Sequence, residues 1–282
     1  MTDWFAQFRA FIQKTTGVVV HDGQEYLVES RLAPIQRQFE FASTEDLIKQ
    51  MLRRQDPQLI GLVTDAMMTS ETFFFRDRQP FEMFRTVVLP RLIETKGDKR
   101  RIRIWSAACA TGQEPYSLAM ILDEEARRLA GWQIEIVATD LSASALQTAN
   151  AGLYNQFEVQ RGLPISLLLR YFQRDNDKWR IAEHIRSRVR FQQLNLLHSF
   201  DRLGTFDVVF CRNVLMYFGP ETRKSVVARM AQTLEPGGML TLGATEFLPG
   251  GEHLLQPLPE HSSLLLKRPA ALDANIQRTV LA

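Results

Sequence analysis

The residues best suited to bind a ligand lie where a short apolar run is followed by a helical pattern. The segment SAACATGQEPYSLAM (106–120) connects the run RIRIW (101–105) to that pattern through small residues and one glycine, Gly112. Small residues let a ligand approach the backbone, and the N-terminus of the following helix attracts an anionic group. The segment therefore predicts a loop that binds a nucleotide-like ligand.

The kind of ligand is indicated by the residues around this loop. The loop has neither the glycine spacing of a dinucleotide fingerprint nor the Gly-Lys-Ser/Thr of a P-loop, which argues against NAD and ATP. A second run, QIEIVATD (133–140), ends in Asp140, and an acid at such a strand end commonly accepts hydrogen bonds from a ribose. A nucleoside without a polyphosphate indicates S-adenosylmethionine, with Glu114 as the acidic partner of its ammonium group. The alternative is that Glu114 and Asp140 only stabilise helix termini, by about 0.3–1 kcal/mol each.

The composition places these residues in an ordinary globular protein. The chain has 282 residues, of which 45% are hydrophobic and 23% charged, and its net charge of +2 argues against a nucleic-acid-binding protein. At roughly 100–200 residues per domain, this length predicts two domains, or one with an appendage. Two cysteines suit a reducing compartment, and no signal peptide or membrane-spanning run is recognisable. We therefore expect a cytoplasmic protein that is not a membrane protein.

The first part of the chain has only helical patterns. Apolar residues repeat at helical spacing, and residues that cap helices stand between the repeats. These patterns predict an all-helical N-terminal domain over 1–75 and a linker with one further helix over 76–100. Pro34 should kink the second helix, because proline removes one backbone hydrogen bond. Arg31 and Arg37 of that helix are expected on a solvated flank or on a face that recognises a partner.

From residue 101 onward, strand-like segments alternate with helical ones. The strand-like segments are 101–105, 133–140, 188–196, 206–213, 238–245 and 262–268, and the helical ones are 114–130, 142–151 and 220–234. Such alternation predicts an α/β fold with a Rossmann-like, doubly wound and mostly parallel sheet, here over 101–270. The interval 153–187 interrupts it and predicts a small inserted β subdomain. Residues 271–282 are expected to form a C-terminal tail.

Five motifs in this order resemble the chemotaxis receptor methyltransferase family of the CheR type. They are MMTSETFFFRD (67–77), WSAACATGQEPYSLAM (105–120), ATDLS (138–142), LNLL (194–197) and FCRNVLMYF (210–218), within a resemblance that extends over residues 1–270. The family combines a helical domain, a class I methyltransferase domain and an inserted β subdomain. The resemblance implies a protein-glutamate O-methyltransferase that acts in chemotaxis adaptation. It would use S-adenosylmethionine to convert glutamates in chemoreceptor cytoplasmic helices to methyl esters, leaving S-adenosylhomocysteine.

The same resemblance implies the site residues. The cofactor contacts carried over by position are Ser70, Thr72, Arg76, Glu114, Asp140, Asn195, Leu196, Arg212 and Asn213, and the catalytic residues are Arg76 and Tyr217. The family usually has asparagine at position 70, so the Ser70 contact is expected to be shorter or water-mediated. A glutamate carboxylate is ionised at neutral pH and needs no general base. Arg76 is therefore expected to position it through two hydrogen bonds, and Tyr217 to contact the carboxylate or the departing sulfur.

Further expectations concern packing and partners. Because Arg76 follows the helical domain and Tyr217 belongs to the sheet domain, the active site is predicted at their junction, with the Phe73–Phe75 run as a hydrophobic plug between them. Within 160–190, eight Lys and Arg against three Asp and Glu indicate a solvated face or a contact with an acidic receptor helix. The segment 171–191 is shorter than in members that dock a receptor's C-terminal pentapeptide, so pentapeptide docking is not carried over. A monomer is expected.

Two other functions stay open on the sequence alone. One is a methyltransferase of the same fold that acts on RNA or a small molecule, although the Asn/Asp-Pro-Pro-Tyr signature of nitrogen-directed enzymes is absent. The other is a catalytically idle signalling module, for which serine at position 70 is the only indication. The five histidines share no metal-ligand spacing, and Cys109 and Cys211 have no neighbouring base. Neither a metal site nor a cysteine nucleophile is therefore predicted.

Overall fold

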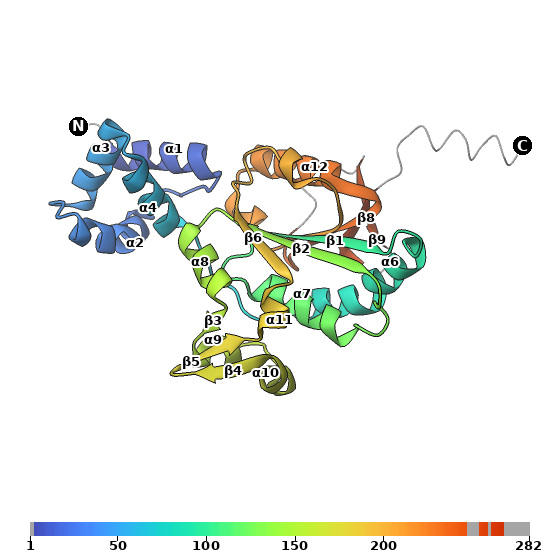
Figure 1. Ribbon diagram of the computed structural model, residues 1–282. Helices are drawn as coiled ribbons and strands as arrows, with labels where there is room; N and C mark the ends of the chain where they lie inside the picture. The colour runs from blue at the N-terminus through green and yellow to red at the C-terminus, as the bar shows by residue number, and fades with distance from the viewer. Residues whose placement is uncertain (1–2, 247–253, 259–260, 268–282) are drawn as a thin grey trace, which may run out of the picture.

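The computed structural model describes residues 3–246, 254–258 and 261–267 of the chain. These residues form a helical bundle, an α/β sheet domain and a small insertion, which lies at the bottom of the view in Figure 1. Within the described ranges, no helix is both long enough and apolar enough to cross a bilayer. The tail expected over 271–282 lies outside the described residues.

Four helices make up the N-terminal bundle, and their ends follow the local sequence. They are α1 (Trp4–Thr16), α2 (Glu25–Gln38), α3 (Thr44–Arg54) and α4 (Pro57–Met67). Gly17 ends α1 in the left-handed conformation, while Ser43 and Asp56 accept backbone N–H bonds at the starts of α3 and α4. The second helix continues through Pro34 to its end. Apolar residues of all four helices form a core of their own.

The further helix predicted within 76–100 is present as three consecutive segments. They are α5 (Gln79–Met83), the π-helical turn η1 (Phe84–Val88) and α6 (Leu89–Thr95). Pro90 stands in the first turn of α6 and has no N–H to donate. The π-helical turn η1 just before it has a different hydrogen-bond pattern, which allows the helix to continue although Pro90 donates no hydrogen bond.

Seven strands form the central sheet, in the order β6-β2-β1-β7-β8-β10-β9. They are β1 (Arg101–Ala107), β2 (Gln133–Asp140), β6 (Val189–Gln193), β7 (Phe206–Cys211), β8 (Leu234–Leu242), β9 (Leu255–Leu258) and β10 (His261–Lys267). The first five in the sheet order pair in parallel, whereas β10 is antiparallel to β8 and β9 is antiparallel to β10. The predicted mostly parallel α/β fold is therefore confirmed.

The strand order reverses at β1, which lies between β2 and β7. In this register Ala107 at the end of β1 pairs with Thr139 of β2 and with Cys211 of β7. The residues that follow these three strands therefore emerge side by side at one edge of the sheet. Open α/β sheets bind their ligands at such a switch point.

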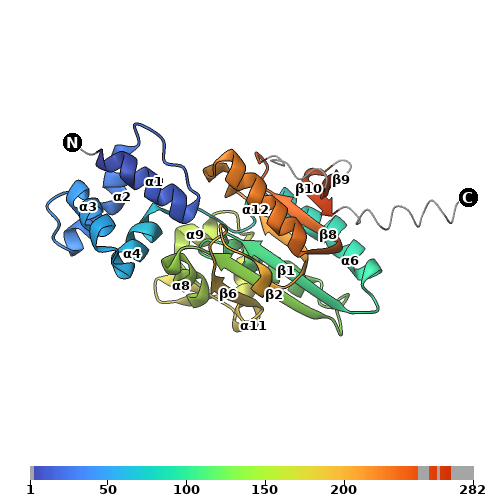
Figure 2. The same cartoon turned by 90° about the horizontal axis from the view of Figure 1, so that it is seen from above.

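Helices cover both faces of the sheet (Figures 1 and 2). The helices of the sheet domain outside the insertion are α7 (Gln113–Glu124), α8 (Ala143–Ala151) and α12 (Pro220–Thr233), with short 3-10 turns η2 (Asp201–Leu203) and η3 (Leu215–Tyr217). Alternate residues of β1 divide between the faces: Ile104 packs in the core with α6 and α7, and Trp105 packs in the core with α12. This two-sided burial holds the switch-point edge rigidly.

The insertion between α8 and β6 is a three-stranded antiparallel sheet with short helices, in the order β3-β5-β4. Its elements are β3 (Leu153–Tyr154), α9 (Gln156–Gln160), α10 (Ile165–Tyr171), β4 (Phe172–Asp175), β5 (Lys178–Ile181) and α11 (Glu183–Arg186). A small β insertion is therefore present where the alternation of strands and helices breaks off.

The middle ring of the phenylalanine run anchors this insertion. Phe74 is fully buried, and its ring meets Tyr154 and Phe172 edge-on, with centroids 5.1 and 5.4 Å away. Gly162 permits the approach, because a Cβ at this position would lie 2.1 Å from the carbonyl oxygen of Phe74. The prediction that the phenylalanine run is packed core is confirmed for Phe74. The prediction that it packs between the helical domain and the sheet domain is wrong for this ring, because Phe74 packs with the sheet domain and the insertion and is not part of the core of the helical bundle.

Several predicted elements have different ends in the structure. The helix predicted to reach residue 130 ends at Glu124. The strand predicted over 238–245 begins at Leu234 and ends at Leu242, so the Pro-Gly-Gly at 236–238 lies inside β8, where the pairing with β7 is irregular. The short edge strand β9 was not predicted, because it has no alternating pattern.

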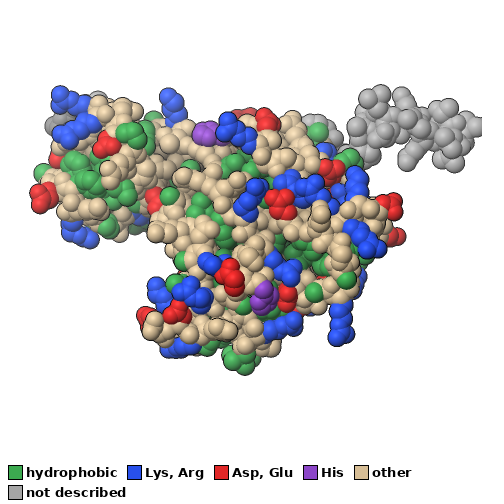
Figure 3. All heavy atoms as spheres, in the orientation of Figure 1, with side chains coloured by type: hydrophobic (Ala, Val, Ile, Leu, Met, Phe, Trp, Pro, Cys, Tyr) green, Lys and Arg blue, Asp and Glu red, His purple; other side chains and the backbone are tan. Residues whose placement is uncertain are grey.

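The positive charge counted over 160–190 is largely compensated in the folded chain. Six of its eight basic residues have a carboxylate partner, in the pairs Arg161–Glu71, Arg170–Asp123, Arg180–Asp175, Arg186–Glu183, Arg188–Asp123 and Arg190–Glu135. Three of the partners (Glu71, Asp123 and Glu135) lie outside that window of sequence. Basic and acidic side chains are accordingly interspersed on the face shown in Figure 3. This pairing favours a solvated face over a strongly cationic one.

Removing the Phe74 ring should destabilise the fold. We expect Phe74→Ala to lower the free energy of unfolding by about 3–5 kcal/mol, because a fully buried aromatic ring leaves a cavity among three packed segments. Urea denaturation followed by circular dichroism measures this change. Phe157→Ala is the matched control, since that ring is 69% exposed and its loss should change stability by no more than about 0.5 kcal/mol. Equal effects of the two variants would contradict the anchoring role of Phe74.

Candidate active site

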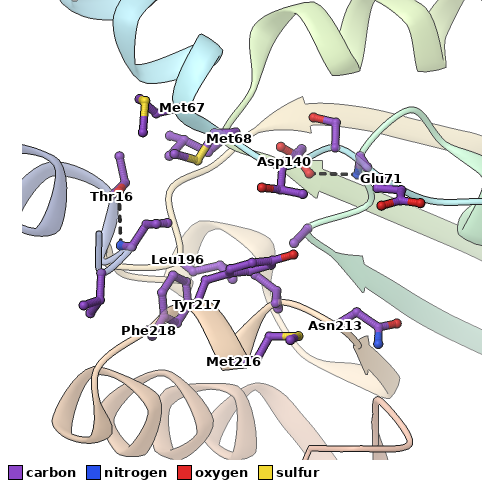
Figure 4. Close-up of a pocket in the computed structure, with 18 of the residues that line it drawn as sticks. Thr16, Met67, Met68, Glu71, Asp140, Leu196, Asn213, Met216, Tyr217 and Phe218 are labelled. Carbon is purple, nitrogen blue, oxygen red and sulfur yellow. Dashed lines mark hydrogen bonds between the residues drawn. The ribbon is translucent and has the colours of Figure 1, made fainter. Parts of the chain in front are cut away.

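A cavity of about 430 Å³ opens where the carboxyl ends of β1, β2 and β7 meet the helical bundle (Figure 4). Its wall includes every residue that was predicted for the site, namely Ser70, Thr72, Arg76, Glu114, Asp140, Asn195, Leu196, Arg212, Asn213 and Tyr217. Residues of the bundle, from Thr16 to Gln24 and on α2, form the facing wall. The cavity thus lies at the junction where the active site was predicted.

The loop after β1 has an uncommon backbone conformation. Ala108, Ala110 and Gly112 have positive φ angles of 56°, 50° and 95°. For a residue other than glycine this conformation costs roughly 1–3 kcal/mol, so the surroundings must hold it. One such contact is the N–H of Ala110, which donates to Oδ2 of Asp140 at 2.8 Å. The small residues noted in the sequence therefore allow a tight loop beside the cavity.

Asp140 connects this loop with the one that follows β2. Its Oδ1 accepts a hydrogen bond from the N–H of Ser142 at 2.9 Å, and its Oδ2 accepts the bond from Ala110. Burial raises the pKa of the Asp140 carboxyl above its ordinary value, and the N–H donors of Ser142 and Ala110 oppose that rise. Each carboxylate oxygen retains a second lone pair, which a ligand hydroxyl can use.

Glu114, at the start of α7, belongs to a buried ion pair. Its Oε1 accepts from the Ser106 hydroxyl at 2.8 Å, and its Oε2 accepts from Nη1 of Arg212 at 3.0 Å. The other terminal nitrogen of Arg212 donates to the Asp77 carboxylate at 2.7 Å and to the Arg76 carbonyl at 2.9 Å. Two carboxylates against one guanidinium leave a net negative charge, as an ammonium-bearing ligand requires.

The segment between α4 and α5 supplies three of the predicted residues to the cavity wall. Ser70 and Thr72 are half-buried there, followed by Arg76. Nη1 of Arg76 donates to the carbonyl of Glu71 at 2.8 Å, and its guanidinium lies 5.7 Å from the centroid of the Phe73 ring. The Arg76 side chain is therefore supported by its own segment.

Two loops of the sheet domain contact the last turn of α1 and the segment that follows it. The amide of Asn195 donates to the Thr15 carbonyl at 2.7 Å, and the N–H of Val19 donates to the Tyr217 carbonyl at 2.9 Å. The Asn195 side chain therefore joins the two domains, while Leu196 beside it is buried. Figure 4 shows the Tyr217 ring in the cavity, facing the same space as Asp140.

Arg31 lies on the cavity wall, not on a free solvated flank. Its guanidinium donates to the Met67 carbonyl and, at 2.9 Å, to the Thr69 hydroxyl. It therefore holds the segment after α4 against α2. In the sequence, Arg31 stands beside the apolar face of α2, and this position was the available signal that its side chain could contact another part of the chain.

Glu246 is a structural partner of the site that the sequence reasoning missed. Its carboxylate accepts hydrogen bonds from the N–H groups of Asn213, Val214 and Met216, in the loop that leads to Tyr217. Asp140 is the last residue of β2, whereas Glu246 lies beyond the end of β8, which is Leu242. The strand-end signal that identified Asp140 therefore did not identify Glu246.

The cysteine near the cavity is not suited to nucleophilic chemistry. Burial raises the pKa of the Cys109 thiol well above its ordinary value, and the negative charges of Asp140 and Glu114 raise it further. Burial likewise raises the pKa of the Cys211 thiol. Both thiols stay protonated at neutral pH, which agrees with the prediction.

Comparison with known proteins gives consistent matches along the chain. The family model described as CheR methyltransferase, SAM binding domain, matches residues 70–263, and that described as CheR methyltransferase, all-alpha domain, matches residues 3–68. The chain is 44% identical over 272 residues to chemotaxis protein methyltransferase 1 of Pseudomonas aeruginosa, covering 95% of this chain and 96% of that protein. It is 40% identical to chemotaxis protein methyltransferase Cher2 of Pseudomonas putida, with the same coverage. A chemotaxis protein methyltransferase of Vibrio parahaemolyticus is 40% identical over 249 residues, 87% of this chain and 90% of that protein.

Neutralising Asp140 should weaken cofactor binding. We expect Asp140→Asn to raise the Kd for S-adenosylhomocysteine by about 10- to 100-fold, since hydrogen bonds to a charged acceptor contribute about 1.5–3 kcal/mol. The new amide group would also face an N–H donor of the loop. Isothermal titration calorimetry measures the Kd. Asp98→Asn, which removes an exposed carboxylate from the connector before β1, should leave it unchanged. Unaltered affinity in Asp140→Asn would contradict a role for this carboxylate in binding.

Proposed function

The chain belongs to the CheR methyltransferase family, and from this membership we propose that it methylates glutamate side chains of chemoreceptors. The cofactor is S-adenosylmethionine, as the family's SAM-binding domain establishes. The proposed acceptors are glutamates in the receptors' cytoplasmic helices, and the products are glutamate methyl esters and S-adenosylhomocysteine. In this proposal the enzyme works in the cytoplasm as a monomer, and docking of a receptor pentapeptide is not part of it.

The residues at the switch point fit the cofactor. Asp140 has lone pairs for the ribose hydroxyls, and the net negative charge around Glu114, Asp77 and Arg212 suits the cationic amino-acid end. When bound, S-adenosylmethionine supplies a methyl group to a carboxylate oxygen. An oxygen–carbon bond forms as the sulfur–carbon bond breaks, the sulfur keeps the electron pair of the broken bond, and the negative charge of the carboxylate and the positive charge of the sulfonium are both lost. No proton is transferred, so the site needs no general base. Its task is to align two reactants and to exclude water.

The charge of the cavity wall is the observation that most favours a carboxylate acceptor. Arg31, Arg76 and Arg223 line the cavity, and the hydrogen bonds of their guanidinium groups go to carbonyl or hydroxyl oxygens. Among the described residues none of the three has a carboxylate within ion-pair distance, so their positive charges are not cancelled. An incoming glutamate side chain would supply the missing negative charge.

Arg76 and Tyr217 have complementary roles in the proposed reaction. Arg76 would hold the acceptor carboxylate through its remaining N–H groups. Holding it too strongly would stabilise the ground state, so the role is positioning. Tyr217 lines the same cavity from the loop after β7. Its hydroxyl would direct the acceptor oxygen toward the methyl group.

The proposed reaction predicts an alkali-labile product. Incubation with methyl-labelled S-adenosylmethionine and membranes that contain the host's chemoreceptors should label the receptor bands. Alkali should then release the label as volatile methanol, because esters hydrolyse under these conditions and N-methyl groups do not. Receptors whose glutamates are replaced by alanine are the matched control. Alkali-stable label would indicate another acceptor atom. No label, from protein that binds S-adenosylhomocysteine, would contradict the receptor proposal and favour an idle signalling module.

Variants at the two proposed catalytic positions should lower turnover more than cofactor affinity. We expect Arg76→Ala and Tyr217→Phe each to reduce kcat by about 10- to 100-fold, since misplacing a reactant by about 1 Å can cost this much. The Kd for S-adenosylhomocysteine should change much less, with the larger change in Arg76→Ala because that residue is also a proposed cofactor contact. Tyr26→Phe, on an exposed tyrosine of α2, is the control for loss of a hydroxyl. Full turnover in both site variants would remove these roles.

A further inference from the structure

The carboxylate of Glu246 is surrounded by backbone N–H groups. Its Oε2 accepts from Asn213 at 2.8 Å and from Gly243 at 2.9 Å, and its Oε1 accepts from Val214 at 3.0 Å and from Met216 at 3.3 Å. Glu246 is only 9% exposed. The four backbone N–H groups therefore form an anion-binding site, and the carboxylate of Glu246 itself is bound there.

These bonds determine the course of the segment between two site residues. The segment begins after Arg212, whose guanidinium is fixed by the buried ion pairs, and it ends at Tyr217. Asn213 between them has a φ of 57°, a conformation that a residue other than glycine adopts only under constraint. Among the described residues, Asn213 and Val214 lie outside the helices and strands, and Met216 lies in the short turn η3. The Glu246 carboxylate thus accepts from these backbone N–H groups the hydrogen bonds that, in a sheet, a neighbouring strand would accept.

We propose that Glu246 is a positioning residue for methyl transfer, which sets the backbone of residues 213–216 so that Tyr217 faces the acceptor. Glu246 is not part of the cavity wall and therefore acts through the loop. The carbonyl of Tyr217 is already bound by the N–H of Val19, so Glu246 and the helical bundle hold the loop from two sides. The inference rests on the methyl-transfer function proposed above, but not on which acceptor is methylated.

Gly243 shows how closely the carboxylate is packed. A Cβ at this position would lie 2.7 Å from Oε2 of Glu246 and 3.0 Å from the backbone nitrogen of Asn213. Gly243→Ala would therefore displace the carboxylate without removing it. This provides a second, independent variant in which the charge of Glu246 is retained.

Glu246→Gln is the first test. The amide keeps the length of the side chain, but its NH₂ group would face N–H donors and lose their bonds. We expect turnover per S-adenosylhomocysteine-binding site to fall by about 10- to 100-fold, with a smaller rise in Kd, because Asn213 is the one proposed cofactor contact whose backbone Glu246 bonds. Gly243→Ala should show the same pattern. Counting binding sites by calorimetry removes the contribution of misfolded protein.

Glu235→Gln is the matched control, because it changes a glutamate at the start of β8, whereas Glu246 follows the end of that strand. Glu235 accepts a hydrogen bond from the Thr205 hydroxyl, away from the cavity. Its variant should keep the turnover of the wild type per binding site. If Glu246→Gln also keeps wild-type turnover per site and only reduces the number of folded molecules, the role of Glu246 is structural and the proposal is wrong.

Hydrogen exchange supplies a readout that does not depend on the acceptor. Peptides covering residues 210–218 should exchange faster in Glu246→Gln than in the wild type, and at the wild-type rate in Glu235→Gln. Unchanged protection of this segment in Glu246→Gln would overturn the proposal even if the receptors proved not to be substrates. Conversely, an alkali-stable product from the wild type would contradict the glutamate acceptor and leave the exchange result valid.

Discussion

The buried guanidinium of Arg212 is the contact on which the geometry of the active site depends. It stands just beyond β7 and pairs with Glu114 of α7 and Asp77 of the linker, while its side chain is only 1% exposed. Removing one member of a buried ion pair typically costs about 3–5 kcal/mol, because the other charge is left unpaired. The same guanidinium binds the carbonyl of Arg76. The cofactor side and the acceptor side of the cavity are thus held in one arrangement by a single side chain.

Two carboxylates perform the same physical task on the loops that surround this pair. Asp140 binds N–H groups in the loops after β1 and β2, and Glu246 binds N–H groups in the loop after β7. Loops that approach a ligand cannot pair with a neighbouring strand, yet their buried N–H groups must be satisfied. An anionic acceptor satisfies several of them together and stabilises left-handed residues such as Ala110 and Asn213. The site therefore combines irregular backbone with a fixed shape.

The helical bundle takes part in the site through direct contacts with these loops. Thr15 and Val19, just before and after the end of α1, bond to Asn195 and Tyr217 of the sheet domain. Arg31 of α2 binds the end of α4 and the segment after it through two hydrogen bonds. Through these contacts the wall contributed by the bundle is placed opposite the cofactor loops. An acceptor side chain that enters between the two domains would therefore meet both sets of residues at once.

The sequence by itself determined most of the helices and strands, and its resemblance to the CheR family named ten of the residues that line the cavity. Helical periodicity and the caps Ser43 and Asp56 are properties of neighbouring residues, and the carboxyl ends of parallel strands necessarily meet at one edge. What only the tertiary structure decided was which distant side chains meet: Phe74 with the insertion, Arg161 with Glu71, and Glu246 with the loop before Tyr217. These contacts join segments far apart along the chain, and no local pattern encodes such partners. They depend on how complete elements pack, because a side chain can satisfy its charge or bury its surface against any suitable neighbour that the packing brings within reach.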